Sequence, residues 1–217
     1  MPKRDNISMS VIRRLPRYYR FLSDLMQNHV SRISSRELSD KMGLTASQIR
    51  QDLNCFGGFG QQGYGYMVEQ LHREIGNILG LSQNHQCILI GAGNLGRAVA
   101  THMSFEARGF SLIGIFDQNQ KLIGTSIRGI PVQDISHLED FCKKNKPNMA
   151  ILCVPRDSVA ALADRLYSLG IRNYWNFSHY DLAIKFPDVI VENVHLSDSL
   201  MTLCYRISEH NLEKGSP

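Results

Sequence analysis

The sequence predicts an α/β protein of two modules, a small helical one at the N-terminus and a larger one built on a doubly wound parallel sheet, followed by a C-terminal helix. Three observations carry this prediction. Two capped helices and a glycine-rich segment fall within residues 1–80, a glycine fingerprint separates an apolar strand from a helix after residue 87, and the charge divides unevenly between the two parts.

Charge separates the two modules. Residues 1–80 carry 11 Lys and Arg against 7 Asp and Glu, a balance of +4, whereas residues 81–217 carry 13 against 13. The whole formal charge of +4 therefore lies in the N-terminal module. A cationic module beside a neutral one indicates a polyanionic partner for the first.

Composition limits the class of protein further. With 217 residues, 43% of them hydrophobic, the chain can form an ordinary folded core. The 5 cysteines are scattered without a C-x-x-C pair and the 8 histidines without H-E-x-x-H, so we expect a reducing compartment, no disulfide framework and no metal site. No apolar run is long enough for a membrane span or a signal peptide, so we expect a cytoplasmic protein that does not associate with membranes.

A first helix is expected from about Pro16 to Asn28, because proline suits the first turn of a helix. Its apolar positions Tyr19, Leu22 and Met26 recur near one face. Four arginines crowd around its start, at positions 13, 14, 17 and 20.

Two further helices follow, each with a recognisable N-terminal capping motif. Ser34-Ser-Arg-Glu37 fits a capping box, and Gly43 suits the left-handed end of that helix. Thr45-Ala-Ser-Gln48 offers a second box that opens a helix to about Phe56. Two short helices joined by a tight glycine turn predict a helix-turn-helix.

The second of these helices has a buried and an outward face. Spacings of three and four predict that Ala46, Ile49, Leu53 and Phe56 are buried. The polar residues between them then point outward, as in a helix laid in the major groove of DNA. A small three-helix bundle with a solvated face is the alternative.

The next segment, GGFGQQGYGY from Gly57, is too rich in glycine for a helix. We interpret it as a β-hairpin that turns near Gln61-Gln-Gly63, the wing of a winged helix, with a flexible linker as the alternative. A further helix is expected from about Val68 to Leu79, ending at Gly80. The module is thus predicted to bind double-stranded DNA, through Arg14, Ser47, Gln48, Arg50, Gln51 and Asn54 of the helices and Gly60 and Gly63 of the wing.

The neutral module opens with the apolar run Cys87-Ile-Leu-Ile90, followed at once by Gly91-Ala-Gly-Asn-Leu-Gly96. A helix and a second strand, Leu112 to Phe116, come next, and Asp117 lies 21 positions after the last of the three glycines. Strand, G-x-G-x-x-G, helix, strand and a terminal acidic residue together form the Rossmann dinucleotide fingerprint.

Each part of the fingerprint has a physical role. The first glycine permits the tight turn, the second lets backbone approach the pyrophosphate, and the third lets helix pack on strand. The acidic residue accepts the ribose hydroxyls of NAD and repels the 2′-phosphate of NADP, so we expect NAD(H) to be the cofactor, although a loop that binds no nucleotide is an alternative. The predicted cofactor-binding residues are Gly91, Ala92, Gly93, Asn94, Leu95, Gly96, Arg97 and Asp117, with Pro155 and Asn176 at the carboxyl ends of later strands.

The remaining chain completes the Rossmann-like sheet. Strands are expected at residues 130–132, 149–154 and 173–177, and helices at about 135–144 and 158–169. We place the module boundaries at 1–80, 81–194 and 195–217.

The final segment predicts a dimerisation helix. Leu196, Leu200, Leu203 and Ile207 lie on one helical stripe, and no sheet remains for this stripe to cover. We therefore expect the helix to pack on a second subunit of a homodimer.

A dehydrogenase would also need a proton-transferring group. None of the 8 tyrosines is part of a Tyr-x-x-x-Lys pair, no second catalytic domain follows, and no spacing supports His102 or His195 as a base. We therefore expect no catalytic residues and a nucleotide-responsive regulator. The alternatives are an NAD-dependent oxidoreductase and a DNA-binding regulator that senses another adenine nucleotide, such as coenzyme A.

The order of these motifs resembles one known family. The recognition-helix segment Gln48-Ile-Arg-Gln-Asp-Leu-Asn-Cys-Phe-Gly57, the glycine-rich wing, GAGNLGRA, IFD, VPR, NF and VEN follow one another as in the redox-sensing transcriptional repressor Rex family. The resemblance implies a homodimer with a swapped C-terminal helix that represses genes of NADH reoxidation. It also implies binding to an inverted-repeat operator when NADH is scarce, and release when NADH replaces NAD⁺.

Two positions depart from that family. Gln51 stands where the family usually has Lys, so one cationic contact to DNA is replaced by a neutral amide. His195 stands where the family commonly has an Asp that pairs across the dimer with an arginine of the first helix, here Arg20. A His–Arg pair cannot form the same salt bridge.

Overall fold

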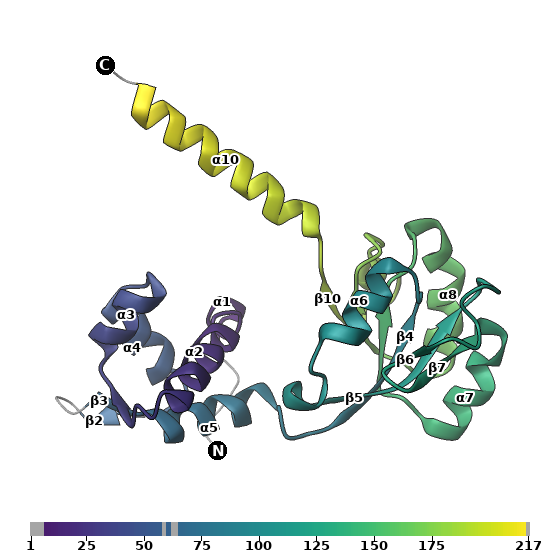
Figure 1. Cartoon of the computed structure of the whole chain (residues 1–217), viewed down its shortest axis with the longest axis horizontal. Coiled ribbons are helices and arrows are strands. Elements are labelled where there is room, and N and C mark those ends of the chain that lie inside the picture. The colour runs from purple at the N-terminus through teal and green to yellow at the C-terminus, as the bar shows by residue number, and fades with distance from the viewer. Residues whose placement is uncertain (1–6, 58–59, 62–64, 216–217) are drawn as a thin grey trace. The chain divides into compact units, whose positions relative to one another are not determined.

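The computed structural model describes residues 7–57, 60–61 and 65–215. The chain divides into two compact units, Met1–Gln83 and Asn84–Pro217 (Figure 1).

The first unit is a winged helix-turn-helix, as predicted. Its helices are α1 (Met9–Ile12), α2 (Leu15–Gln27), α3 (Ser35–Met42), α4 (Ala46–Asn54) and α5 (Val68–Leu79). Strands β1 (Arg32–Ile33), β2 (Gly60–Gln61) and β3 (Gly65–Met67) form an antiparallel sheet in the order β1-β3-β2. The predicted hairpin is therefore present and gains a third strand, β1, while the residues 62–64 expected at its turn lie outside the described part of the chain.

Local capping chemistry defines the helix-turn-helix. The Ser34 hydroxyl accepts from the Glu37 N–H at 3.1 Å, and the Glu37 carboxylate accepts from the Ser34 N–H at 2.7 Å. Gly43 ends α3 with a φ of 60°. The second box is only half formed, because Thr45 accepts from the Gln48 N–H whereas the Gln48 side chain turns to another partner. At its other end, helix α4 stops at Asn54, two residues before the predicted end.

The buried face of α2 differs from the prediction. The buried side chains are those of Leu15, Tyr18, Leu22 and Leu25. The expected positions Tyr19 and Met26 were wrong because each lies one residue round the helix from this stripe: Met26 is 37% exposed, and Tyr19 is half-buried against His72 of α5, with ring centroids 4.0 Å apart.

The second unit has a Rossmann-like sheet of seven strands in the order β10-β9-β8-β4-β5-β7-β6. All neighbouring strands are parallel except β6 and β7. The strands are β4 (His85–Ile90), β5 (Phe110–Asp117), β6 (Ser126–Ile127), β7 (Ile130–Asp134), β8 (Met149–Leu152), β9 (Asn173–Asn176) and β10 (Ile190–Asn193). The chain runs from β4 to β7 on one side of the sheet and then returns to β8 on the other side of β4, which confirms the doubly wound prediction.

Helices cover both faces of this sheet (Figure 1). They are α6 (Asn94–His102), α7 (Leu138–Asn145), α8 (Arg156–Ser168) and α9 (Leu182–Lys185), with short 3₁₀ turns η1 (Glu106–Arg108) and η2 (Ile135–His137). Alternate residues of β4 point to opposite faces of the sheet, and each face has its own hydrophobic core. Ile88 and Ile90 pack in one core with α7, α8 and α9. Cys87 and Leu89 pack in the other core with α6. Strands β6 and β10 and helix α9 were not predicted.

The last helix, α10 (Leu196–Gly215), extends beyond the predicted end at Ile207. Its apolar stripe is exposed, with Leu196 at 62%, Leu200 at 67%, Leu203 at 49% and Ile207 at 52%. Within the described residues, no helix combines the length and the apolar character that a membrane crossing requires.

Candidate functional site

The glycine loop connects β4 to α6 in a conformation that two of its glycines require. Gly91 has a φ of 96°, and a Cβ there would lie 2.5 Å from the Cys153 carbonyl oxygen. A Cβ on Gly96 would lie 1.8 Å from the Gly91 carbonyl oxygen. Both positions therefore exclude a side chain. At Gly91 the positive φ and the backbone just after β8 exclude it, and at Gly96 the packing of α6 on the loop does.

The middle glycine has the opposite environment. Gly93 caps the N-terminus of α6, and a Cβ on it would meet no atom within 4 Å. No side chain caps this helix end, so the first-turn N–H groups, which have no partner inside a helix, face the same open space. Open backbone, free donors and the positive end of a helix dipole fit a pyrophosphate.

Asp117 lies against this loop. It is the last residue of β5, and its carboxylate accepts from the Ala92 N–H at 2.6 Å and from the Asn119 N–H at 2.8 Å. A carboxylate has about four acceptor sites, so capacity remains for ribose hydroxyls. The structure thus brings the predicted acidic residue to the predicted glycine loop.

The other predicted cofactor residues divide into open and closed positions. Leu95 is 38% exposed, and Arg97 and Pro155 are also exposed; Pro155 caps the start of α8, three residues after the carboxyl end of β8. Asn176 is fully buried at 0%, and its amide is used internally. It donates to Asn193 Oδ1 and to the Tyr180 carbonyl, each at 2.8 Å, and accepts from Ser178. The structure makes Asn176 a brace between β9 and β10 rather than a surface of the crevice.

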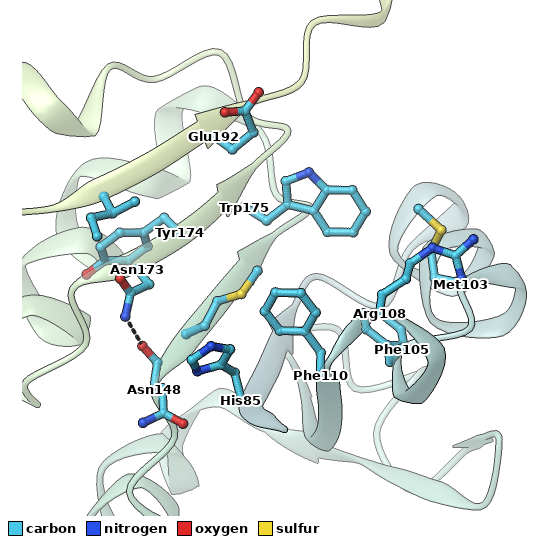
Figure 2. Close-up of a pocket in the computed structure, with 12 residues that line it drawn as sticks. His85, Met103, Phe105, Arg108, Phe110, Asn148, Asn173, Tyr174, Trp175 and Glu192 are labelled. Carbon is cyan, nitrogen blue, oxygen red and sulfur yellow. Dashed lines mark hydrogen bonds between the residues drawn. The ribbon is translucent and has the colours of Figure 1, made fainter. Parts of the chain in front are cut away.

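A separate apolar cavity of about 550 Å³ lies in the same unit (Figure 2). Its lining includes residues from the first positions of five strands: His85, Phe110, Met149, Asn173 and Ile190. The amino ends of parallel strands lie opposite the carboxyl ends, where the glycine loop is. The cavity is therefore not part of the nucleotide crevice.

The outward face of α4 is as predicted for Ser47, Arg50, Gln51 and Asn54, which are all exposed. The Arg50 guanidinium donates to Ser35 Oγ at 3.1 Å. Within the described residues, the other three side chains make no hydrogen bond, so their donors and acceptors are free for a ligand. Gly60 begins β2, whereas Gly63 lies outside the described residues.

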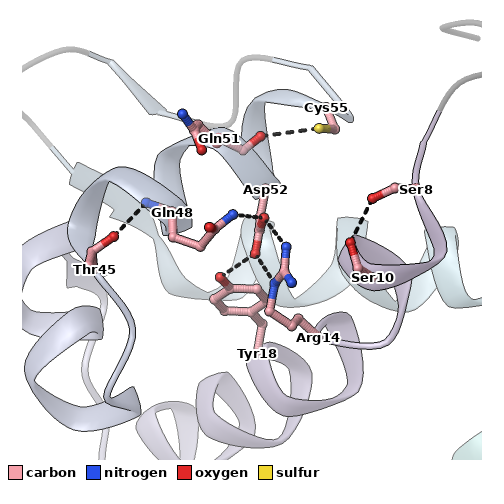
Figure 3. A network of polar contacts seen from close by, with 9 residues as sticks. All are labelled: Ser8, Ser10, Arg14, Tyr18, Thr45, Gln48, Gln51, Asp52 and Cys55. Atoms are coloured by element: carbon pink, nitrogen blue, oxygen red, sulfur yellow. Dashed lines mark hydrogen bonds and ion pairs between the residues drawn. The ribbon is translucent and has the colours of Figure 1, made fainter.

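Arg14 and Gln48 have a different environment from the one predicted. Both bind the carboxylate of Asp52, which is 1% exposed on the inner side of α4 (Figure 3). Sequence reasoning missed Asp52. Its position, three residues after Ile49 and beside Leu53, is the signal that places it toward the core.

The network also determines the protonation of its members. Burial alone raises the pKa of Asp52, but the hydrogen bonds from Arg14, Gln48 and Tyr18 outweigh it, so the pKa lies below its usual value. Burial, reinforced by the hydrogen bond to Asp52, raises the pKa of Tyr18. Asp52 is therefore a carboxylate and Tyr18 a neutral donor at neutral pH.

Comparison with known proteins supports both units. A family profile described as "Putative DNA-binding protein N-terminus" matches residues 6–54, and one described as "CoA binding domain" matches residues 82–180. The redox-sensing transcriptional repressor Rex of Thermoanaerobacter pseudethanolicus is 58% identical over 214 residues, covering 99% of this chain and 95% of the relative. This chain belongs to the Rex family.

Further Rex proteins agree with that assignment. The Rex of Clostridium perfringens is 52% identical over 213 residues, covering 98% of this chain and 100% of the relative. A crystal structure of RSP in complex with β-NAD⁺ and operator DNA matches with a TM-score of 0.86 and 57% identity over 97% of both chains. A structure of RSP with β-NADH matches with a TM-score of 0.86 and 55% identity over 96% of this chain and 97% of that one.

One position in this Rex protein has its own local environment. The ring of His195 stacks on His179, with centroids 4.5 Å apart at 24°, and its Nδ1 lies 3.5 Å from the Asp198 carboxylate. His195 thus joins the loop after β9 to the first turn of α10.

Proposed function

We propose that this Rex protein is a redox-sensing transcriptional repressor that binds an inverted-repeat operator as a homodimer and leaves it when NADH replaces NAD⁺. The observation that carries the proposal is the open backbone at Gly93 with Asp117 beside it, in a chain that also has a winged helix. The RSP structures with NAD⁺ and operator DNA and with NADH support it.

In the nucleotide unit, the first-turn N–H groups of Asn94, Leu95 and Gly96 would hold the pyrophosphate, with Arg97 adding positive charge. Asp117 would accept the ribose hydroxyls and disfavour the 2′-phosphate of NADP. The cofactor supplies a redox-dependent charge on its nicotinamide ring. The protein residues bind and orient it.

In the DNA-binding unit, α4 would enter the major groove with Ser47, Arg50, Gln51 and Asn54 facing the base edges. The glycine-rich wing, with Gly60 and Gly63, would approach the backbone or the minor groove.

The homodimer would form through α10. A stripe of leucines and an isoleucine that is half to two-thirds exposed is unfavourable in water and becomes favourable when covered. Exchange of α10 between subunits, with the segment from residue 195 as the exchanged part, would cover it.

The switch requires a difference in affinity between two states of the dimer. Reduced nicotinamide is uncharged and less well hydrated than the oxidised cation, so it favours a closed, apolar crevice between subunits. Closure would move the two DNA-binding units away from the spacing of about one helical turn, roughly 34–36 Å, that adjacent half-sites require.

We further propose that the protein is cytoplasmic and not an enzyme, since the relatives that it matches over nearly its full length are named transcriptional repressors. Robust turnover of NADH with small carbonyl compounds would favour the oxidoreductase alternative instead. The match to a coenzyme A binding domain keeps that nucleotide as a second candidate ligand, which predicts that Asp117→Ala barely changes NADH affinity.

The test is fluorescence anisotropy of a labelled operator duplex, taken from the RSP complex, with NADH, NAD⁺ or coenzyme A added to the bound protein. We expect release by NADH at concentrations where NAD⁺ leaves the complex intact and coenzyme A has no effect. Equal effects of NADH and NAD⁺ would contradict redox sensing, and release by coenzyme A alone would replace the proposed ligand.

A further inference from the structure

We propose that Asp52 is a positioning residue for DNA recognition: its carboxylate holds α4 in one orientation against α2 and so determines operator specificity. The inference rests on the proposed function, because it presupposes that α4 reads DNA. It also changes the role of Arg14 and Gln48, from direct DNA contacts to residues that act through Asp52.

The geometry defines the carboxylate position from two helices (Figure 3). At the start of α2, Arg14 donates through Nε to Oδ2 and through Nη2 to Oδ1, each at 2.7 Å, and Tyr18 donates to Oδ2 at 2.9 Å. From α4 itself, Gln48 Nε2 donates to Oδ1 at 2.8 Å. Both oxygens thus accept two hydrogen bonds each, in a site where Asp52 is 1% exposed.

Such a network restrains rotation in a way that the apolar core does not. Ile49 and Leu53 anchor α4 in the core, but apolar contact has little directional preference. A bidentate pair between a planar guanidinium and a carboxylate is directional, because both hydrogen bonds weaken when either group turns. The Asp52 network therefore fixes the rotation of α4 about its own axis.

Rotation matters because the outward residues move together. At the outer surface of a helix, about 5–6 Å from its axis, a rotation of roughly 10° displaces side chains by about 1 Å. Hydrogen bonds to base edges tolerate only about 0.5 Å in donor–acceptor distance. Loss of the network would thus disturb contacts by Ser47, Gln51 and Asn54 to bases, while contacts to phosphates, which depend chiefly on charge, would persist.

The test compares full-length Asp52→Asn with Asp24→Asn. Each variant removes one negative charge from the same unit, but Asp24 is exposed on α2 and outside the network. Affinity is measured for the operator duplex of the RSP complex and for an unrelated duplex of equal length at the same salt concentration. We expect the ratio of the two affinities to fall at least tenfold in Asp52→Asn, with affinity for the unrelated duplex within threefold of wild type. In Asp24→Asn the ratio should stay within twofold of wild type.

Arg14→Lys and Tyr18→Phe separate positioning from stability. Lysine keeps the charge but loses the bidentate fork, and phenylalanine removes one donor while keeping the ring. If Asp52→Asn fails to fold, as judged by circular dichroism, a lower specificity ratio in either of these variants at wild-type melting temperature supports the proposal.

The outcomes distinguish this inference from the proposed function. If Asp52→Asn folds and keeps the wild-type specificity ratio, the inference is overturned and the proposed function is left intact. If Asp52→Asn does not fold, an unchanged specificity ratio in both Arg14→Lys and Tyr18→Phe has the same meaning. A wild-type protein that does not distinguish the operator from unrelated DNA overturns both.

Discussion

Alanine substitutions at two glycines of the same loop should separate the stability of the fold from the binding of the nucleotide. At Gly96 the new Cβ would lie 1.8 Å from the Gly91 carbonyl oxygen and 2.9 Å from its carbonyl carbon. These are backbone atoms, which cannot swing aside as a side chain can. At Gly93 the Cβ would have no atom within 4 Å, so the apoprotein accommodates it.

The distances set the expected magnitudes. Real Cβ contacts do not fall below 3.0 Å, so α6 would have to move from the loop by at least 1.2 Å, the difference between 3.0 and 1.8 Å. Overpacking of a core costs about 1–3 kcal/mol and more where backbone must shift, so we expect Gly96→Ala to destabilise the nucleotide-binding unit by about 3 kcal/mol or more. Gly93→Ala should cost about 1 kcal/mol or less, the difference between glycine and alanine at an N-cap.

Thermal unfolding with and without NADH measures both effects. Gly96→Ala should lower the melting temperature of this unit by roughly 10 °C, and Gly93→Ala by at most about 4 °C. At NADH one hundred times the wild-type Kd, wild type should gain about 2.7 kcal/mol of stability, and Gly93→Ala nearly none, because its methyl occupies the space for the pyrophosphate. A wild-type melting temperature in Gly96→Ala, or the full wild-type gain of stability with NADH in Gly93→Ala, would refute the assignment of this loop as the pyrophosphate site.

Three further predictions concern other parts of the chain. Asp117→Ala should weaken NADH binding at least tenfold, since hydrogen bonds to a charged group contribute about 1.5–3 kcal/mol, and it should weaken NADPH binding less. Fluorescence titration with both nucleotides measures the two affinities. Equal losses for NADH and NADPH would contradict the contact between Asp117 and the ribose. The double variant Leu200→Asp, Leu203→Asp should be a folded monomer by light scattering, because Leu200 is 67% and Leu203 is 49% exposed within one subunit. A dimer of this variant would exclude α10 from the interface. The pKa of Asp52 is lowered in the folded state, so its stabilisation is complete above its unfolded value of about 3.9 and is lost as pH falls through the lower folded pKa. The melting temperature of the DNA-binding unit, measured from pH 7 to 3, should therefore fall at low pH, and it should fall less in Asp52→Asn. Identical pH profiles for the two proteins would contradict a stabilising role for the Asp52 charge.

Structure that depends on local chemistry was predictable from the sequence. Helix α5 spans Val68–Leu79 and ends at Gly80 with a φ of 72°, as predicted, and both halves of the Ser34–Glu37 box are formed. Such signals need only residues within a few positions of each other. The glycine fingerprint is an exception among distant contacts, because its known spacing predicted that Asp117 lies beside the loop although Asp117 is 25 positions from Ala92.

Structure that depends on distant partners was not predictable in this way. Arg14 and Asp52 are 38 positions apart, and nothing in either segment alone indicates that they pair. A helix that begins at Pro16 omits Leu15, which is fully buried and defines the true buried face of α2, so the predicted stripe lies one residue away from that face. Strand β10 is only four residues long with a mostly exposed pattern, so neither length nor apolar periodicity marked it.

We expect this Rex protein to respond to the redox state of NAD(H) and not to its amount. The most direct measurement holds the sum of NADH and NAD⁺ constant, varies their ratio, and follows operator binding by anisotropy. We predict that the bound fraction falls as the NADH share rises and recovers when NADH is oxidised to NAD⁺ in the same sample. A bound fraction that stays the same at every ratio and changes only with total dinucleotide would contradict redox sensing by this protein.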